Sequence, residues 1–580
     1  MNVLLLHPED PIPVSSKIQW DLIVDFARAP AAVYEECANR NSCMVKSVFD
    51  FAGGIRDLYK AKDLLQPGAG ILLDDHGIDW WEIFLPSLAP QLQQLILLER
   101  LANELGSRCN LWTTRPDWRA RALEYFCGHD VHVVAGQPHN GSLLHRAKHY
   151  LRAARKLDPA QLQQVLWDKF DRHHIVRAGI ALRPKLPGRF VVLPSAYINV
   201  SRMVVAYTKL LPEQKFLLVC ARSNAQLSHL PANVTQISLD PYFSGAPEKS
   251  LARLTQAVGR LKVQLAASSK ELRGAIALGQ LDPIVPFMRW GLTIRKAWDN
   301  LFACVEASAC FSADDSNPYT RIPLLLAQRR KVPALACHHG ALDALKAVKA
   351  ESADVYLAKN EMEYDYLRRL CRVPASNMII AGPPRPAVPI PAKFTNNKRR
   401  WLVFFSEPFS VMHWRADQVY RDLLPRLLNV AERCGLKMVF KLHPFESVGT
   451  FQQLLKNVPG REASVKASIV LTGAMTDEFW ENMSCAIVIQ STVAIECAER
   501  GIPVFLCSWL GDSYSEYIEQ FARYRGGHVL QHPAEMEDMP GMLPRLRNTR
   551  LEAGLQSAPD AIAFRDWLSG NPRERMAAQV

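Results

Sequence analysis

The sequence lacks the features that mark membrane-spanning and exported proteins. Its 580 residues contain no run of about 18 uninterrupted apolar residues, so we predict no transmembrane helix. The amino-terminal segment MNVLLLHPED has no basic region and only a short apolar run, so we predict no signal peptide. These absences favour a cytoplasmic protein whose contact with a membrane, where it has one, is peripheral.

Cysteine is present but forms no pattern. The 13 cysteines include no CxxC pair and are irregularly spaced, which argues against a disulfide framework and a zinc ribbon. Several lie inside apolar runs, such as Cys220 and Cys507, where a thiol packs as a small hydrophobic side chain. The cysteines therefore favour a reducing compartment.

The common nucleotide and cofactor motifs are also missing. No GxxxxGK[ST] segment is present, which disfavours a P-loop NTPase, and no GxGxxG follows the first apolar segment, which disfavours a dinucleotide enzyme. We predict no cofactor. The adjacent residues Asp74, Asp75 and His76 resemble a ligand set, but neighbours on a strand point to opposite faces. We therefore predict no metal site.

What the sequence does contain is a globular composition with a basic excess. Lys and Arg number 69 against 57 for Asp and Glu, giving a net charge of +12. This favours anionic partners such as nucleotides, phosphates or an anionic membrane surface. The basic residues are dispersed and no basic–aromatic motif accompanies them, so we predict no nucleic-acid partner.

Short apolar segments alternate with amphipathic helical patterns along most of the chain. This alternation is typical of parallel sheets covered by helices. Proline-rich strings at 183–189 and 383–393 interrupt it and predict boundaries. We therefore predict an N-terminal α/β domain with a helical end, a second α/β domain with a helical insertion, a third α/β domain and a helical tail. Their respective ranges are 1–187, 188–385, 394–545 and 546–580.

In the third α/β domain, polar side chains follow apolar strands. VFKLHPFE places His443, Pro444 and Glu446 after one strand, and VFFSE places Ser406 after the first strand. A histidine there can donate a hydrogen bond to a phosphate or accept a proton. Glu446 could bind a sugar hydroxyl, and Ser406 is a further candidate. The plainer alternative is a surface histidine in a turn.

A second segment of this domain, AIVIQSTVAIECAERGIPV, predicts a strand, a turn and a helix. Ser491 and Thr492 form the turn, and Glu496 lies one helical turn further on. Free N–H groups and the helix dipole at such a turn favour a phosphate. Glu496 is then placed to reach a ribose or another hydroxyl. Simple N-capping of the helix is the alternative.

The second α/β domain carries its own strand-end groups. KVPALACHHGAL places His339 after a short strand, where an imidazole suits a general base at neutral pH. In SADDSNPYTR, Asp314 and Asp315 could orient an acceptor and Arg321 could meet a phosphate. Structural roles, as a strand-end hydrogen bond and as helix capping, are the alternatives for these segments.

The N-terminal domain contains the segment ILLDDHGIDWWE. We interpret it as a buried strand that delivers Asp74 and Asp75, and paired carboxylates after a strand can act as a base. Trp80 and Trp81 could stack on a sugar ring, although two neighbouring aromatics are more often core.

The order of these motifs, with HP before the Ser-Thr turn and HG before both, resembles GT-B glycosyltransferases. The resemblance covers residues 190 to about 530. It extends to capsule and lipopolysaccharide transferases that use CMP-activated Kdo or sialic acid, and to CDP-glycerol glycerophosphotransferases. It implies a GT-B-like pair of Rossmann-type doubly wound domains, with an additional N-terminal α/β domain.

The resemblance also implies roles and partners. A nucleotide-sugar donor would bind at His443, Pro444, Ser491 and Thr492, without a metal. The loop that contains Ser406 lies near the donor in the GT-B enzymes that the chain resembles. His339 would be the base toward a polysaccharide or glycolipid acceptor at the inner membrane face. Asp74 and Asp75 resemble the acidic motif of bacterial sialyltransferases, from which they depart at His76. A glycerophosphotransferase, a UDP-sugar epimerase and a non-catalytic nucleotide- or glycan-binding module are the alternatives.

Overall fold

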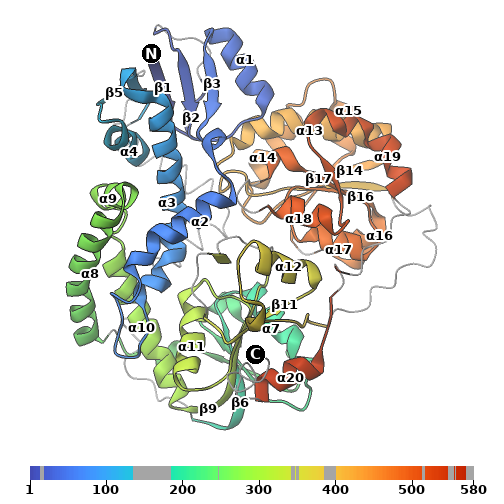
Figure 1. The fold of residues 1–580 in the computed structure, drawn as a ribbon. Coiled ribbons are helices and arrows are strands. Elements are labelled where there is room, and N and C mark those ends of the chain that lie inside the picture. Colours follow the sequence, from blue (N-terminus) through green and yellow to red (C-terminus); the bar gives the residue numbers. More distant parts are fainter. Residues whose placement is uncertain are drawn as a thin grey trace. The chain divides into compact units, whose positions relative to one another are not determined.

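The computed structural model describes residues 1–12, 18–115, 117–134, 185–245, 247–340, 346–347, 352–384, 400–473, 475–511, 516–546, 554 and 557–569. Within them the chain is an α/β protein with three sheets (Figure 1). All strand pairs in these sheets are parallel, which confirms the α/β class predicted from the alternation. Most of the helical end predicted before residue 187 lies outside the described residues, as does the proline-rich string after residue 384. Among the described helices, none is both long and apolar enough to cross a membrane.

Two compact units divide the chain, and each combines segments that are distant in sequence. Unit 1 contains Met1–Gly54, Gln94–Trp167 and Pro389–Leu551. Unit 2 contains Ile55–Gln93, Asp168–Val388 and Glu552–Val580. These units follow packing rather than continuous sequence, so the domain boundaries at 187, 385 and 545 stay predictions.

Unit 1 begins with a five-stranded sheet in the order β3-β2-β1-β4-β5. Its strands are apolar along most of their length because helices cover the sheet, as is usual for parallel sheets. Helix α1 packs on β3 and α4 packs on β5. The strands are β1 (Asn2–Leu6), β2 (Leu22–Asp25), β3 (Met44–Ser47), β4 (Asn110–Thr113) and β5 (Val131–Val133), and the helices are α1 (Ala31–Asn41) and α4 (Trp118–Cys127).

Unit 1 also contains a six-stranded sheet in the order β15-β14-β13-β16-β17-β18. Numbered along the chain, this is the 3-2-1-4-5-6 order of a doubly wound sheet. Helices α13, α15 and α19 cover one face, and α17 and α18 cover the other (Figure 1). The strands are β13 (Trp401–Phe405), β14 (Lys437–Lys441), β15 (Ile469–Leu471), β16 (Met483–Val488), β17 (Val504–Cys507) and β18 (His528–Leu530).

The helices of this sheet are amphipathic. In α13 (Ala416–Arg433), Val419, Leu423 and Leu427 are buried at helical spacing against the strands. The remaining helices are α14 (Val448–Lys456), α15 (Glu462–Ala467), α16 (Asp477–Asn482), α17 (Val493–Glu499), α18 (Tyr517–Arg523) and α19 (Met539–Leu546).

Unit 2 is built on a seven-stranded sheet in the order β12-β11-β10-β9-β6-β7-β8. The order in which successive strands are added to the sheet reverses between β6 and β9, as it does between β13 and β16 in unit 1, while all strands stay parallel. The strands are β6 (Leu186–Ser195), β7 (Phe216–Cys220), β8 (Val234–Ser238), β9 (Val305–Ser312), β10 (Ala334–Cys337), β11 (Val355–Ala358) and β12 (Met378–Ile380).

Three helices of unit 2 lie where the sequence predicts a helical insertion. Between β8 and β9 the chain forms α8 (Glu248–Ser268), α9 (Lys270–Ala277) and α10 (Ile284–Phe302). From the carboxyl-terminal segment, α20 packs Phe564 against Tyr207 and Phe311, with ring centroids 5.4 Å apart in each pair. The others are α2 (Ile55–Leu65), α3 (Trp80–Leu105, shared with unit 1), α7 (Ile198–Thr208), α11 (Pro318–Arg329), α12 (Glu361–Arg369) and α20 (Ala561–Ser569).

Candidate functional site

The predicted donor residues lie at one edge of the six-stranded sheet. Ser406 follows β13, His443 follows β14, and Ser491 and Thr492 follow β16. Because β13 pairs with both β14 and β16 in parallel, these strand ends are neighbours. The sheet order reverses between β13 and β16, and ligands of doubly wound sheets bind outside the strand ends at such a point.

The loop after β14 is fixed by two hydrogen bonds around His443. Its backbone N–H donates to Ser406 Oγ at 2.8 Å, and the backbone N–H of Phe445 donates to His443 Nδ1 at 3.2 Å. Since Nδ1 accepts, the neutral ring carries its proton on Nε2. Burial, and then the charge of Lys441, lower the pKa of His443. At neutral pH this histidine is therefore a neutral hydrogen-bond donor. Pro444, which follows it, is exposed.

Two carboxyl groups lie behind this loop. The Tyr420 hydroxyl donates to Glu446 Oε1, while Glu446 Oε2 is buried with no hydrogen-bond partner among the described residues. Glu407, which follows Ser406, is 8% exposed and accepts a hydrogen bond from the Gln490 N–H at 3.4 Å.

The pKa values of both carboxyl groups are raised. Burial raises the pKa of each to about 7. The charge of Glu446 raises the pKa of Glu407 further, whereas hydrogen bonds from Ser406 and Tyr420 oppose the shift at Glu446. Glu407 is not among the site residues predicted from the sequence. A carboxylate directly after the central strand was the signal that could have found it.

The turn after β16 has little side-chain capping of helix α17. Thr492 stands at the N-cap position of α17 but makes no side-chain capping hydrogen bond. Ser491 Oγ accepts from the Val493 N–H at 3.4 Å, near the limit for such a bond. Glu496 is half-buried in the first turn of α17. The next two N–H groups, of Ala494 and Ile495, donate to the carbonyl oxygens of Ser491 and Thr492 at 3.1 and 3.0 Å. Phosphate binding by these residues stays a prediction.

Unit 2 has a second polar cluster, at the ends of β6, β9 and β10. The Tyr197 hydroxyl lies 3.2 Å from His339 Nε2 and 3.3 Å from Asp314 Oδ2. His339 Nδ1 lies 3.0 Å from the carbonyl oxygen of Ala313, which can only accept, so Nδ1 carries a proton. The neutral ring then has its lone pair on Nε2, as a general base requires.

The tyrosine in this cluster stays protonated. Burial, followed by the charge and hydrogen bond of Asp314, raises the pKa of Tyr197 above its ordinary value. Its single hydroxyl proton can be donated either to Asp314 or to His339. The structure therefore brings His339 and Asp314 together, as the sequence analysis did not foresee, through a residue that it did not name.

Arg321 lies in a different environment from the one predicted. It is 1% exposed in α11, and burial lowers its pKa against the opposing charges of Asp315 and other carboxylates. Asp315 is itself 1% exposed and pairs with Lys346. This placement favours a structural role for Arg321, and contact with a phosphate stays a prediction.

Asp74 and Asp75 do not follow a strand, and that part of the sequence interpretation is wrong. Leu73 forms only an isolated bridge with Asp79, which closes a tight loop. Asp74 Oδ1 accepts the N–H groups of His76 and Ile78, at 2.8 and 3.0 Å. The side chain of Asp74 therefore folds the loop locally, and local hydrogen bonding of this kind competes with a strand.

Both carboxylates of this loop are engaged by Arg295 on α10. Its Nη1 lies 2.6 Å from Asp74 Oδ2 and 2.8 Å from Asp75 Oδ1. Burial would raise the pKa of Asp75, but the hydrogen bond and charge of Arg295 outweigh it and lower the pKa to about 2. A carboxylate with so low a pKa is a weak base at neutral pH.

The adjacent tryptophans belong to the core of unit 2. Trp80 and Trp81 are both fully buried. Trp80 Nε1 donates to Asp74 Oδ2 at 2.9 Å, and Trp81 Nε1 donates to the Leu65 carbonyl at 2.9 Å. Their indole N–H groups are satisfied inside the protein, so the core alternative holds and sugar stacking does not.

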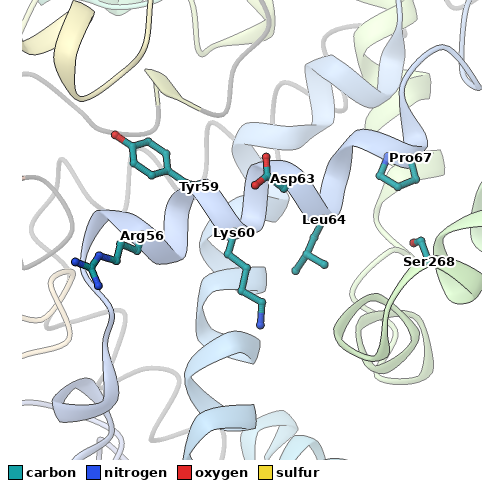
Figure 2. A pocket seen from close by; sticks show the side chains of 7 residues that line it. All are labelled: Arg56, Tyr59, Lys60, Asp63, Leu64, Pro67 and Ser268. Atoms are coloured by element: carbon teal, nitrogen blue, oxygen red, sulfur yellow. The ribbon is translucent and has the colours of Figure 1, made fainter.

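A cavity of about 450 Å³ lies elsewhere in unit 2, beside α2. Figure 2 shows Lys60 and Leu64 pointing to one side of this helix, with Pro67 and Ser268 beyond them. Lys60 is already paired with Glu271 at 2.6 Å. None of the predicted site residues lines this cavity, so it is not the candidate site.

No protein-family model matches the chain, and no curated protein matches it in sequence. Similar solved structures include the UDP-GlcNAc 2-epimerase from Methanocaldococcus jannaschii, which is 9% identical. That match covers 67% of this chain and 99% of the epimerase, with a TM-score of 0.41.

Two further similar structures are transferases or polymerases by name. The lipopolysaccharide outer core galactosyltransferase WaaB is 10% identical, with 68% of this chain and 100% of WaaB covered and a TM-score of 0.35. The wall teichoic acid polymerase TagF is 11% identical, with 75% and 99% covered and a TM-score of 0.35.

Proposed function

We propose that the chain is a glycosyltransferase that moves a sugar from a nucleotide-sugar donor onto a surface polysaccharide or glycolipid precursor. The observation that carries this proposal is the meeting of Ser406, His443 and Ser491 at the reversal point of the six-stranded sheet. That edge is where doubly wound sheets bind nucleotides.

The donor is proposed to be CMP-linked, carrying Kdo or another nonulosonic acid. The motifs around His443 and Ser491 resemble those of CMP-sugar transferases, and this resemblance supports the choice. The Nε2 proton of the neutral His443 ring is suited to a hydrogen bond with a phosphate oxygen. The turn at Ser491 and Thr492 is the second proposed contact, because the Thr492 side chain makes no capping hydrogen bond. Glu496 is proposed to bind a ribose hydroxyl.

The base is proposed to be His339. Its Nδ1–H group donates to the Ala313 carbonyl, which leaves the Nε2 lone pair to accept a proton from an acceptor hydroxyl. Asp314 would accept the hydrogen bond of the Tyr197 hydroxyl and so hold that hydroxyl beside His339 Nε2. The low pKa of Asp75 and the burial of Asp74 make these carboxylates the weaker candidates.

The leaving group is a nucleotide phosphate, which hydrogen-bond donors can stabilise without a metal. We propose that the acceptor is met at the inner membrane face. The net charge of +12 supports attraction to anionic lipid there.

Thermal unfolding in the presence of CMP, CDP, UDP, UMP and GDP tests the proposal. A nucleotide present at 100 times its dissociation constant should stabilise the folded protein by about 2.7 kcal/mol. We expect a selective increase in Tm with a cytidine nucleotide, which His443→Ala and Ser491→Ala reduce. His229→Ala is the matched control, because His229 is exposed and belongs to unit 2, which does not contain the six-stranded sheet.

The other outcomes separate the alternatives. A UDP-selective increase would replace the CMP-sugar donor with a UDP-sugar and favour a transferase or epimerase of that kind. No increase with any nucleotide would contradict donor binding at this edge.

A further inference from the structure

The carboxyl groups of Glu407 and Glu446 are positioned behind the strand ends rather than in open solvent. Glu407 accepts a hydrogen bond from the Gln490 N–H, in the turn that follows β16. Glu446 accepts a hydrogen bond from the Tyr420 hydroxyl on α13. Glu407 is thereby linked to the turn after β16, and Glu446 to helix α13.

The surroundings of Glu446 favour a neutral carboxyl group. Its Oε2 is buried and has no hydrogen-bond partner among the described residues. Ionisation would leave this carboxylate desolvated, and the hydrogen bonds of Ser406 and Tyr420 offset only part of that cost, whereas a proton removes the charge. Glu407 is also buried, at 8% exposed, and its Oε1 accepts the Gln490 N–H.

We propose that Glu407 and Glu446 form a proton-holding pair, and that a nucleotide phosphate binding at this edge of the sheet transfers a proton from solvent onto the pair. This inference rests on the proposed nucleotide site. The physical reason is that a phosphate beside ionised carboxylates is repelled, and protonation removes the repulsion. Proton uptake and phosphate binding therefore favour each other.

The other titratable groups at this edge are Tyr420, Lys441 and His443. Burial, and then the charge of Glu446, raise the pKa of Tyr420, which stays neutral. Burial lowers the pKa of Lys441 and of His443. A phosphate beside the neutral His443 ring would favour protonation of this histidine as well, so the glutamine variants below decide whether the two glutamates, whose pKa values are raised to about 7, take up the proton.

Calorimetric titration of CMP at pH 8, in buffers with different ionisation enthalpies, measures the protons taken up per nucleotide bound. We expect measurable uptake by the wild-type protein and at least a halving in Glu407→Gln and in Glu446→Gln. Glu537→Gln is the matched control, because Glu537 is exposed in the same unit. Nucleotide binding without proton uptake, or full uptake in both glutamine variants, would overturn the proposal.

Infrared difference spectra between pH 6 and pH 8, recorded without nucleotide, report on the pair alone. We expect a protonated carboxyl band that disappears as the pH rises and that weakens in Glu407→Gln. Absence of this band in the wild-type protein would overturn the proton-holding pair itself. Absence of CMP binding with the band present would instead overturn the proposed nucleotide site and, with it, the coupling.

Discussion

Arg415 and Asp25 form a buried, bidentate ion pair between segments 390 residues apart in sequence. Arg415 Nε and Nη2 each lie 2.7 Å from a carboxylate oxygen of Asp25. The guanidinium also donates to the carbonyl oxygens of Asp10 and His7. This ion pair joins the last residue of β2 to the residue that precedes α13. It therefore connects the five-stranded and the six-stranded sheet of unit 1.

Loss of this ion pair should destabilise unit 1. Arg415→Met leaves the Asp25 carboxylate buried without its cation, and breaking a buried pair in this way costs about 3–5 kcal/mol. The free energy of unfolding from equilibrium denaturation measures the effect. Arg461→Met is the control, because its pair with Glu432 is partly exposed and should contribute less than about 1 kcal/mol. Equal losses in the two variants would contradict the assignment.

A methyl group at position 291 should disrupt the core of unit 2. A Cβ atom on Gly291 of α10 would lie 2.1 Å from the Trp80 ring, so the fully buried indole would have to move. We expect Gly291→Ala to lower the free energy of unfolding by about 1–3 kcal/mol.

Gly259 in α8 provides the matched comparison, because no atom lies within 4 Å of a Cβ placed there. Gly259→Ala should stabilise the helix by about 0.5–1 kcal/mol. Denaturation curves that show the same sign for both alanine variants would contradict the packing described for α10.

Stability should fall as the pH rises toward neutrality, through Glu407. Its folded pKa is raised from the ordinary 4.5 to about 7, so the folded state binds more protons than the unfolded chain between these values. The free energy of unfolding then decreases with pH across this window, by at most about 1.4 kcal/mol per pH unit for the group. Above about pH 7 the contribution is constant.

Glu407→Gln isolates this effect from other titrating groups. The difference in unfolding free energy between the wild-type protein and Glu407→Gln should decline from pH 4.5 to 7. The same difference for Glu537→Gln should change much less, since Glu537 is exposed. A pH-independent difference for Glu407→Gln would show that this carboxyl group is not protonated in the folded state.

Ser406 should support nucleotide binding through the His443 loop. Its hydroxyl accepts the His443 N–H at 2.8 Å, and Ser406→Ala leaves that N–H without an acceptor. We expect CMP affinity to weaken about tenfold, which corresponds to about 1.4 kcal/mol. Ser468→Ala is the control, because that hydroxyl only bonds the Val465 carbonyl in the preceding turn. Unchanged affinity in Ser406→Ala would contradict the loop's role.

Much of the fold follows from local sequence patterns. Continuous apolar runs such as Leu402–Phe405 and Phe216–Cys220 become central parallel strands because helices cover both faces. The same alternation locates the strand ends, which is why His443, Ser491 and His339 were predicted as strand-end residues from sequence alone.

The features that the sequence did not reveal depend on tertiary contacts. ILLDDHG resembles a strand followed by free carboxylates, but Arg295 on a distant helix neutralises both of them. Likewise, nothing local to Glu407 indicates that it is buried beside Glu446, and nothing near Tyr197 indicates its contact with His339. Protonation states and ion pairs of this kind require the packed structure.

The most direct test of the account is turnover of a CMP-linked nonulosonic acid, measured together with CMP affinity in wild-type protein, His443→Ala and His339→Gln. We expect CMP release by the wild-type protein and weakened CMP binding in His443→Ala. His339→Gln should keep its CMP affinity but lose about 10²–10⁴-fold in turnover, as expected for removal of a general base. Normal turnover by His339→Gln, or CMP binding without turnover of any nucleotide sugar by the wild-type protein, would contradict the account.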